Sequence, residues 1–174
     1  MGAKDIFANL RSGNPEIVIQ SIEEIKEQGT AAHFPYLINL LHETSNPEIK
    51  KMIITLFGEL KSTSTVPLLM DAIQDVEYKE ELKELVSCCW QNGMNYSPYL
   101  SVFVDLVISQ DFPVALEALT VIENMDGKID QKIIEQELEK VKQVPVSNDD
   151  QKNFLLTSLP TAIKNIMQSD KEFS

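Results

Sequence analysis

The sequence predicts an all-α fold, a right-handed α-α superhelix (solenoid) of about four helical hairpins with a capping helix at each end. The segment Asn14–Ile17 returns as Asn46–Ile49, and Pro35 returns as Pro67, always at an offset of 32 residues. Between these markers, apolar residues recur at helical spacing. A fixed period of this length is typical of stacked hairpins, in which each unit buries its apolar face against the next. We therefore expect one domain over residues 1–174.

The first two hairpins, residues 14–45 and 46–77, share the same start and turn signals. Asn14 and Asn46 are expected to cap the first helix of each hairpin, because each precedes a proline in the first helical position. Gly29 is expected to end the first of these helices. A proline then stands near the start of each second helix, where its missing N–H costs nothing.

The third and fourth hairpins are predicted at residues 78–109 and 111–143. The third pairs a helix over 78–92 with one over 97–109, separated by a glycine and a serine-proline start. The fourth opens with an aspartate before a proline and pairs with a helix near 129–141. Each hairpin thus carries a start signal of its own.

The two ends are expected to differ from the repeats, because terminal units must present one polar face to water. Residues 1–13 are predicted to form the N-terminal cap, and residues 148–168 a C-terminal helical segment. Phe154 falls on the expected apolar stripe of that segment. Pro160 is expected to kink or restart it, since a proline inside a helix costs about 3 kcal/mol.

The second hairpin carries a family resemblance. Residues 46–75 read NPEIKKMIITLFGELKSTSTVPLLMDAIQD, with an early proline, basic residues near the start, a glycine at the end of the first helix and Val-Pro-x-Leu opening the second. This pattern resembles a HEAT repeat, and the resemblance extends over about residues 14–143. It implies a HEAT-like superhelix whose second helices line the concave side. A fold of this kind hosts many activities and does not specify one.

Composition and charge limit the classes of partner. Hydrophobic residues make up 43% and charged residues 24%, as in a folded domain, and the net charge is −12. Because nucleic acids and anionic membranes attract basic surfaces, we expect neither as a partner. A basic protein segment suits this charge, although acidity also serves solubility alone. The absence of an apolar run of about 18–20 residues and of spaced cysteines favours a cytoplasmic location.

Candidate catalytic groups are few. The pair His42–Glu43 invites comparison with HEAT-like di-iron hydroxylases, which the fold resembles, but the chain has only 2 histidines and the repeat-equivalent positions hold no second pair. HEAT-like DNA glycosylases need a basic face, whereas Arg11 is the only arginine. Cys88 and Cys89 are expected to point inward as inert thiols. We expect no catalytic residue, no metal and no cofactor.

The candidate partner-binding surface lies on the second helices, where polar residues interrupt the apolar stripe. Repeat-equivalent positions place them in a ladder, which suits an extended ligand because each repeat offers one contact. The ladder consists of Asn39, His42, Asp71, Gln74, Asp75 and Asp105. The acidic run from Asp71 to Glu84, which includes Glu81, is expected to be a solvated helix face.

A secondary candidate interface is the aromatic group Trp90, Tyr96 and Tyr99. Trp90 could anchor a partner or fill the space between two repeats. These observations favour a non-catalytic protein-protein interaction scaffold or adaptor. The alternative is a HEAT-like enzyme or enzyme subunit, lyase-like and with a bound small molecule, which would need an enclosed pocket near Trp90 or His42.

Overall fold

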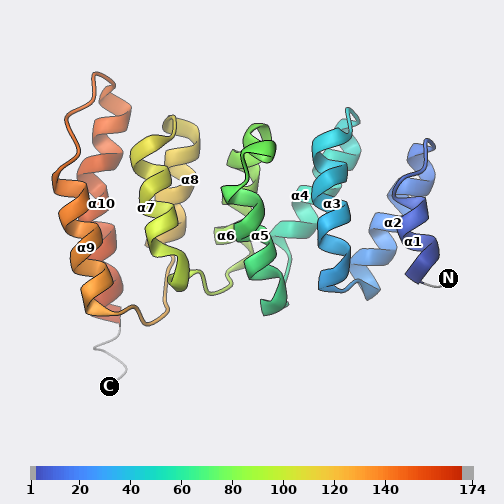
Figure 1. Cartoon of the computed structure of the whole chain (residues 1–174), viewed down its shortest axis with the longest axis horizontal. Helices are drawn as coiled ribbons and strands as arrows, with labels where there is room; N and C mark the ends of the chain where they lie inside the picture. Colours follow the sequence, from blue (N-terminus) through green and yellow to red (C-terminus); the bar gives the residue numbers. More distant parts are fainter. Residues whose placement is uncertain (1–2, 170–174) are drawn as a thin grey trace. The chain divides into compact units, whose positions relative to one another are not determined.

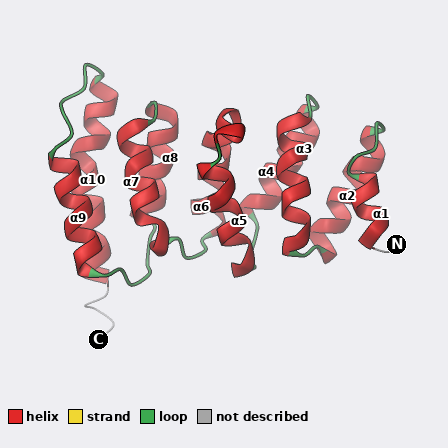
Figure 2. Ribbon diagram, in the orientation of Figure 1, coloured by secondary structure: helices red, strands yellow, loops and turns green. Residues whose placement is uncertain are grey.

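The fold is all-helical. A computed structural model describes the backbone of residues 3–169 and the side chains of residues 6–166. The described residues form ten α-helices and four short 3₁₀ helices (η), and no strand occurs among them (Figures 1 and 2). The all-α prediction is confirmed, whereas the superhelical arrangement stays a prediction. The helices group into two compact units, residues 1–92 and residues 93–174, which are described separately. The single-domain organisation also stays a prediction.

The first unit contains three hairpin-like steps. Its α-helices are α1 (Ala3–Asn9), α2 (Pro15–Gln28), α3 (Phe34–Glu43), α4 (Pro47–Gly58), α5 (Val66–Gln74) and α6 (Leu82–Asn92), and its 3₁₀ helices are η1 (Ala31–His33), η2 (Thr63–Thr65) and η3 (Val76–Glu81). The predicted caps are confirmed: Asn14 Oδ1 accepts from the N–H of Glu16 at 3.0 Å, and Asn46 Oδ1 accepts from the N–H of Glu48 at 2.9 Å. These side chains satisfy N–H groups that a helix start leaves unpaired.

Packing in this unit follows the repeat. Helix α2 packs against α4, and α4 packs against α6, while α3 packs against α5. Phe34 and Phe57 stack across this core with ring centroids 4.6 Å apart. Leu69 on α5 is 0% exposed and belongs to this core. The inward orientation of Cys88 and Cys89 is confirmed as well, because both are buried.

The second unit begins with η4 (Ser97–Tyr99) and continues with α7 (Leu100–Ser109), α8 (Phe112–Glu123), α9 (Gln131–Lys142) and α10 (Asp150–Ser169). Helix α10 packs against α7, α8 and α9, and α7 packs against α8. The predicted cap at the start of α8 is confirmed, since Asp111 Oδ1 accepts from the N–H of Val114 at 3.4 Å. Within residues 3–169, no helix combines the length and apolarity that a membrane span needs.

Three local expectations are wrong. Helix α6 starts at Leu82 rather than near residue 78, because the preceding residues form η3 and Tyr78 leaves the helical region at φ −96° and ψ 26°. Helix α10 runs through Pro160 without restarting, whereas a kink at Pro160 stays a prediction. The packing of α10 against three helices offsets the hydrogen bond that proline removes. Phe154 is 69% exposed and lies off the buried stripe of α10.

Candidate functional site

The structure places five of the six ladder residues in the first unit. Asn39 and His42 lie on α3, Asp71 and Gln74 lie on α5, Asp75 directly follows α5, and Asp105 lies on α7 of the second unit. All are exposed except His42, whose side chain is 35% exposed. The expected solvent-facing polar positions on α3 and α5 are therefore present.

Tyr78 joins two of these residues. Its hydroxyl donates to Asn39 Oδ1 at 2.7 Å, and its ring meets the edge of the His42 ring at a centroid distance of 5.7 Å. Both contacts bridge 36 or more positions of sequence and attach η3 to α3. From the sequence, Tyr78 is predicted only as the start of a helix, and this role is not indicated.

Glu81 overturns the prediction of a fully solvated acidic run, because it is only 5% exposed. His42 Nδ1 lies 3.1 Å from Glu81 Oε2, and Lys50 Nζ lies 3.7 Å from Glu81 Oε1. A buried carboxylate is costly unless charged or hydrogen-bonding groups compensate it, and these two groups do so. The available signal was spacing: Glu81 stands three residues after buried Tyr78 and four before buried Leu85, on one helical stripe.

Carboxylates from separate elements surround Tyr78 and His42. Hydrogen bonding of the His42 ring to the Glu81 carboxylate raises the pKa of His42, partial desolvation opposes this rise, and the charges of Glu77 and Glu80 add to it. Burial raises the pKa of the Tyr78 hydroxyl, and neighbouring carboxylates raise it further. We call the exposed carboxylates around this pair the acidic surface, which consists of Glu43, Asp75, Glu77 and Glu80.

Three ladder residues at the end of α5 have different local roles. Asp75 Oδ1 accepts from the N–H of Glu77 at 3.0 Å and so caps η3. Gln74 Nε2 donates to the carbonyl of Met70 at 3.0 Å. Asp71 makes no side-chain hydrogen bond or ion pair among residues 6–166, whose side chains the structure describes. Asp75 is thus structural as well as acidic, whereas Asp71 is only a surface charge.

Asp105 belongs to a network of the second unit. Lys140 Nζ lies 2.9 Å from Asp105 Oδ1 and 2.7 Å from Glu137 Oε2. Glu137 is buried and accepts a hydrogen bond from Ser101 Oγ at 2.7 Å. Lys140 therefore neutralises much of the charge that Asp105 would offer to a basic ligand.

The aromatic candidates differ in exposure. Trp90 on α6 is 40% exposed, and Tyr99 in η4 is half-buried. Tyr96 is buried, and its ring packs edge-on against Phe103 with centroids 6.0 Å apart. Tyr96 thus contributes to the core of the second unit, while Trp90 retains a solvent-facing edge in the first.

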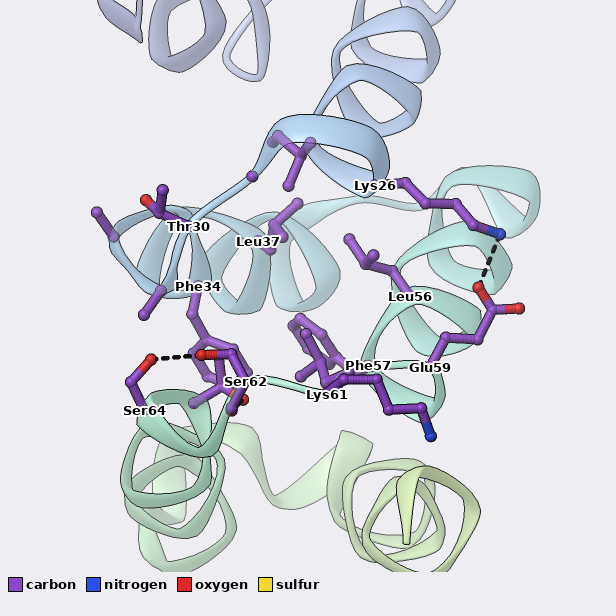
Figure 3. A pocket seen from close by; sticks show the side chains of 16 residues that line it. Lys26, Thr30, Phe34, Leu37, Leu56, Phe57, Glu59, Lys61, Ser62 and Ser64 are labelled. Carbon is purple, nitrogen blue, oxygen red and sulfur yellow. Dashed lines mark hydrogen bonds and ion pairs between the residues drawn. The ribbon is translucent and has the colours of Figure 1, made fainter. Parts of the chain in front are cut away.

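One hollow of the first unit has a volume of 690 Å³ and lies beside the turns that follow α2 and α4. Apolar residues that include Phe34, Leu37 and Leu56 line it, and an ion pair of 2.7 Å between Lys26 and Glu59 crosses its rim (Figure 3). Its lining includes neither His42 nor Trp90. This hollow is not predicted from the sequence.

A smaller hollow of 450 Å³ lies where the chain leaves α1 and meets α3, and we call it the N-terminal pocket. It is lined by Leu10, Arg11, Ser12, Tyr36, Asn39, Leu40, Glu43 and Thr44. It is more polar than the first hollow and includes Asn39, a ladder residue, and Glu43, part of the acidic surface.

Among the described residues, no group of three or more His, Cys, Asp or Glu side chains is arranged to hold a metal ion. The sequence matches no protein-family model and no curated protein.

Proposed function

We propose that the protein is a non-catalytic scaffold or adaptor, a HEAT-like superhelix whose acidic surface binds a basic segment of another protein. One observation carries this proposal: four exposed carboxylates, those of Glu43, Asp75, Glu77 and Glu80, surround Tyr78 and His42. Carboxylates from the end of α3, from the residue between α5 and η3, and from η3 itself thus gather in one place. Such a concentration of exposed negative charge attracts cationic side chains and speeds their association.

The repeat and the packing support the HEAT-like part of the proposal. The 32-residue period of the sequence separates the starts of α2 and α4, and the succession continues with α6, each helix packed against the next. In this arrangement α3 and α5 present their exposed residues side by side, since the two helices also pack together. Asn39 and Asp71 then offer polar contacts next to the acidic surface, as an extended ligand requires.

A HEAT-like enzyme or enzyme subunit is the second candidate, and the 690 Å³ hollow of Figure 3 is the observation in its favour. A largely apolar hollow with a few polar groups is typical of small-molecule sites. Its charged groups are already engaged: Lys26 pairs with Glu59, and Lys61 Nζ donates to the carbonyl of Asn92 at 3.0 Å. Catalysis needs a group positioned toward a substrate, so the acidic surface supports binding better than this hollow supports chemistry.

The test reverses the charge of two carboxylates of the acidic surface that have no structural role. Asp75 is unsuitable because it caps η3, so the variant is Glu77→Lys with Glu80→Lys. The matched control is Glu23→Lys with Glu27→Lys on α2, which changes the net charge equally at exposed positions. Binding of a fluorescent lysine-rich peptide is measured by anisotropy. We expect the first variant to weaken binding by roughly tenfold or more and the control to have a small effect. Equal weakening by both variants would contradict a local site.

A further inference from the structure

The N-terminal pocket adjoins the acidic surface but differs from it in charge. Asn39, which lines the pocket, accepts the hydrogen bond of Tyr78, and Glu43 contributes to the raised pKa of the same hydroxyl. Its volume of 450 Å³ lies within the range of sites that hold a small group or a chain end. A ligand on the acidic surface can therefore continue into this pocket.

Arg11, the only arginine of the sequence, provides the positive charge of the pocket. Its guanidinium carbon lies 5.5 Å from the centre of the Tyr36 ring. Tyr36 packs on Phe7 at 4.4 Å, and Phe7 stacks on His33 at 4.9 Å, so the guanidinium ends a stack of three rings. Stacking orients an arginine while leaving its N–H groups at the edge available. Among residues 6–166, whose side chains the structure describes, Arg11 has no carboxylate at ion-pair distance.

Two further groups complete the chemistry of the pocket. Asn39 uses its oxygen for the Tyr78 hydroxyl, so its amide N–H groups remain as donors in the described part of the chain. Glu43 stands one helical turn beyond Asn39 on α3 and is exposed without an ion-pair partner there. The guanidinium and the amide can donate hydrogen bonds to a carboxylate of the ligand, and the neighbouring glutamate can pair with a cation of the ligand. The pocket therefore fits a ligand that carries both charges close together.

We infer that the N-terminal pocket binds the C-terminal carboxylate of the basic segment, whose last residue is a lysine or arginine. The carboxylate lies against Arg11 and the Asn39 amide, and the basic side chain faces Glu43. The rest of the segment lies on the acidic surface, in keeping with recognition of chain ends by convergent donors. This inference rests on the proposed function, because it gives the direction of the segment that the acidic surface binds.

The test compares two N-acetylated lysine-alanine hexapeptides that end in lysine, one with a free C-terminal carboxylate and one with a C-terminal amide. The amide carries more positive charge, so attraction to an acidic surface alone favours the amide. The inference requires the opposite order. We expect the free acid to bind roughly three- to tenfold more tightly than the amide, because it gains charge-assisted hydrogen bonds.

Two variants that each remove one positive charge show whether the preference for the free acid depends on the N-terminal pocket. Arg11→Gln should abolish the preference for the free acid while leaving the affinity for the amide unchanged, which also shows that the variant is folded. Lys51→Gln, at an exposed position on α4, should keep the preference. Equal binding of both peptides, or a preference that survives Arg11→Gln, overturns the inference and leaves the proposed function standing. Binding of neither peptide overturns both.

Discussion

At the scale of single residues, the central feature is a carboxylate that is almost sealed from water. Glu81 is 5% exposed and is compensated by His42 on one oxygen and Lys50 on the other. Both partners lie on helices of the preceding hairpins, so the pairs connect η3 to α3 and α4. The two partners remain partly exposed, and this limits what the loss of Glu81 would cost.

We expect Glu81→Gln to lower the free energy of unfolding by about 1–2 kcal/mol. The loss is smaller than for a fully buried ion pair, because the side chains of His42 and Lys50 can be solvated once the carboxylate is gone. Urea unfolding of the variant against the wild type measures this difference. Glu80→Gln is the matched control, because Glu80 is exposed and adjacent. If both variants unfold at the same urea concentration, Glu81 does not stabilise the attachment of η3.

His42 should make stability depend on pH. Its pKa is raised above 6.5 in the folded state, chiefly by the hydrogen bond with Glu81. A histidine whose pKa is higher in the folded state than in the unfolded state stabilises the protein at pH values below the unfolded-state pKa. This stabilisation is lost as the pH rises through the folded-state pKa. We expect the Tm difference between wild type and His42→Gln to be largest near about pH 5 and to shrink toward about pH 8.

The comparison in the His42 experiment isolates one group, because Lys50, Tyr78, Glu77, Glu80 and Glu81 remain in both proteins. A one-dimensional NMR titration of the His42 ring protons provides a direct reading of the raised pKa. A Tm difference that stays constant across this pH range would contradict the assignment.

At the scale of elements, α5 is stabilised by burial. Leu69 is 0% exposed, and α5 packs against α3 and α6. We expect Leu69→Ala to lower the free energy of unfolding by about 2–5 kcal/mol, since it loses transfer energy and leaves a cavity. Chemical unfolding measures the loss. Asp71→Ala on the same helix is the control, because Asp71 is exposed and its change should stay within about 0.5 kcal/mol. A similar cost for both would show that α5 is less tightly packed than the structure indicates.

The elements also show why some features could be predicted and others could not. The caps at Asn14, Asn46 and Asp111 are recognisable because a cap depends on a side chain and N–H groups two or three residues away. The segment η3 depends on Tyr78 reaching Asn39, which lies 39 positions earlier. No local pattern encodes such a contact, so this turn was predicted as helix.

In the candidate site, too, some features could be predicted from the sequence and others could not. Solvent-facing positions on α3 and α5 follow from helical period, and Asn39, Asp71 and Gln74 are exposed as that period requires. Neutralisation of Asp105 by Lys140 spans 35 positions and could not be deduced from either neighbourhood. The position of Arg11 over Tyr36 is likewise a tertiary result. Sequence period thus predicts which positions face solvent, and tertiary contacts determine which of them remain available to a ligand.

At the scale of the whole molecule, we expect the excess of acidic residues to destabilise the folded protein and to strengthen the binding of a basic peptide. The chain has 27 acidic and 15 basic residues, and surface pairs such as Lys26 with Glu59 are half exposed. Exposed ion pairs contribute only about 0–1 kcal/mol each to stability. With a net charge of −12, the acidic side chains repel one another in the folded protein. Raising sodium chloride from about 0.1 M to about 1 M shortens the screening length from about 10 Å to about 3 Å.

We therefore expect this increase in salt to raise the Tm, because screening relieves self-repulsion more than it weakens the few exposed ion pairs. The same increase should weaken binding of a lysine-rich peptide, because attraction to the acidic surface is screened too. Thermal unfolding and anisotropy at both salt concentrations measure the two responses. The variant Glu77→Lys with Glu80→Lys should show a smaller gain in Tm and a smaller loss of affinity, since it removes charge from both effects. A Tm that falls with salt would mean that the ion pairs around Glu81, Glu137 and Glu59 outweigh the repulsion between the remaining carboxylates.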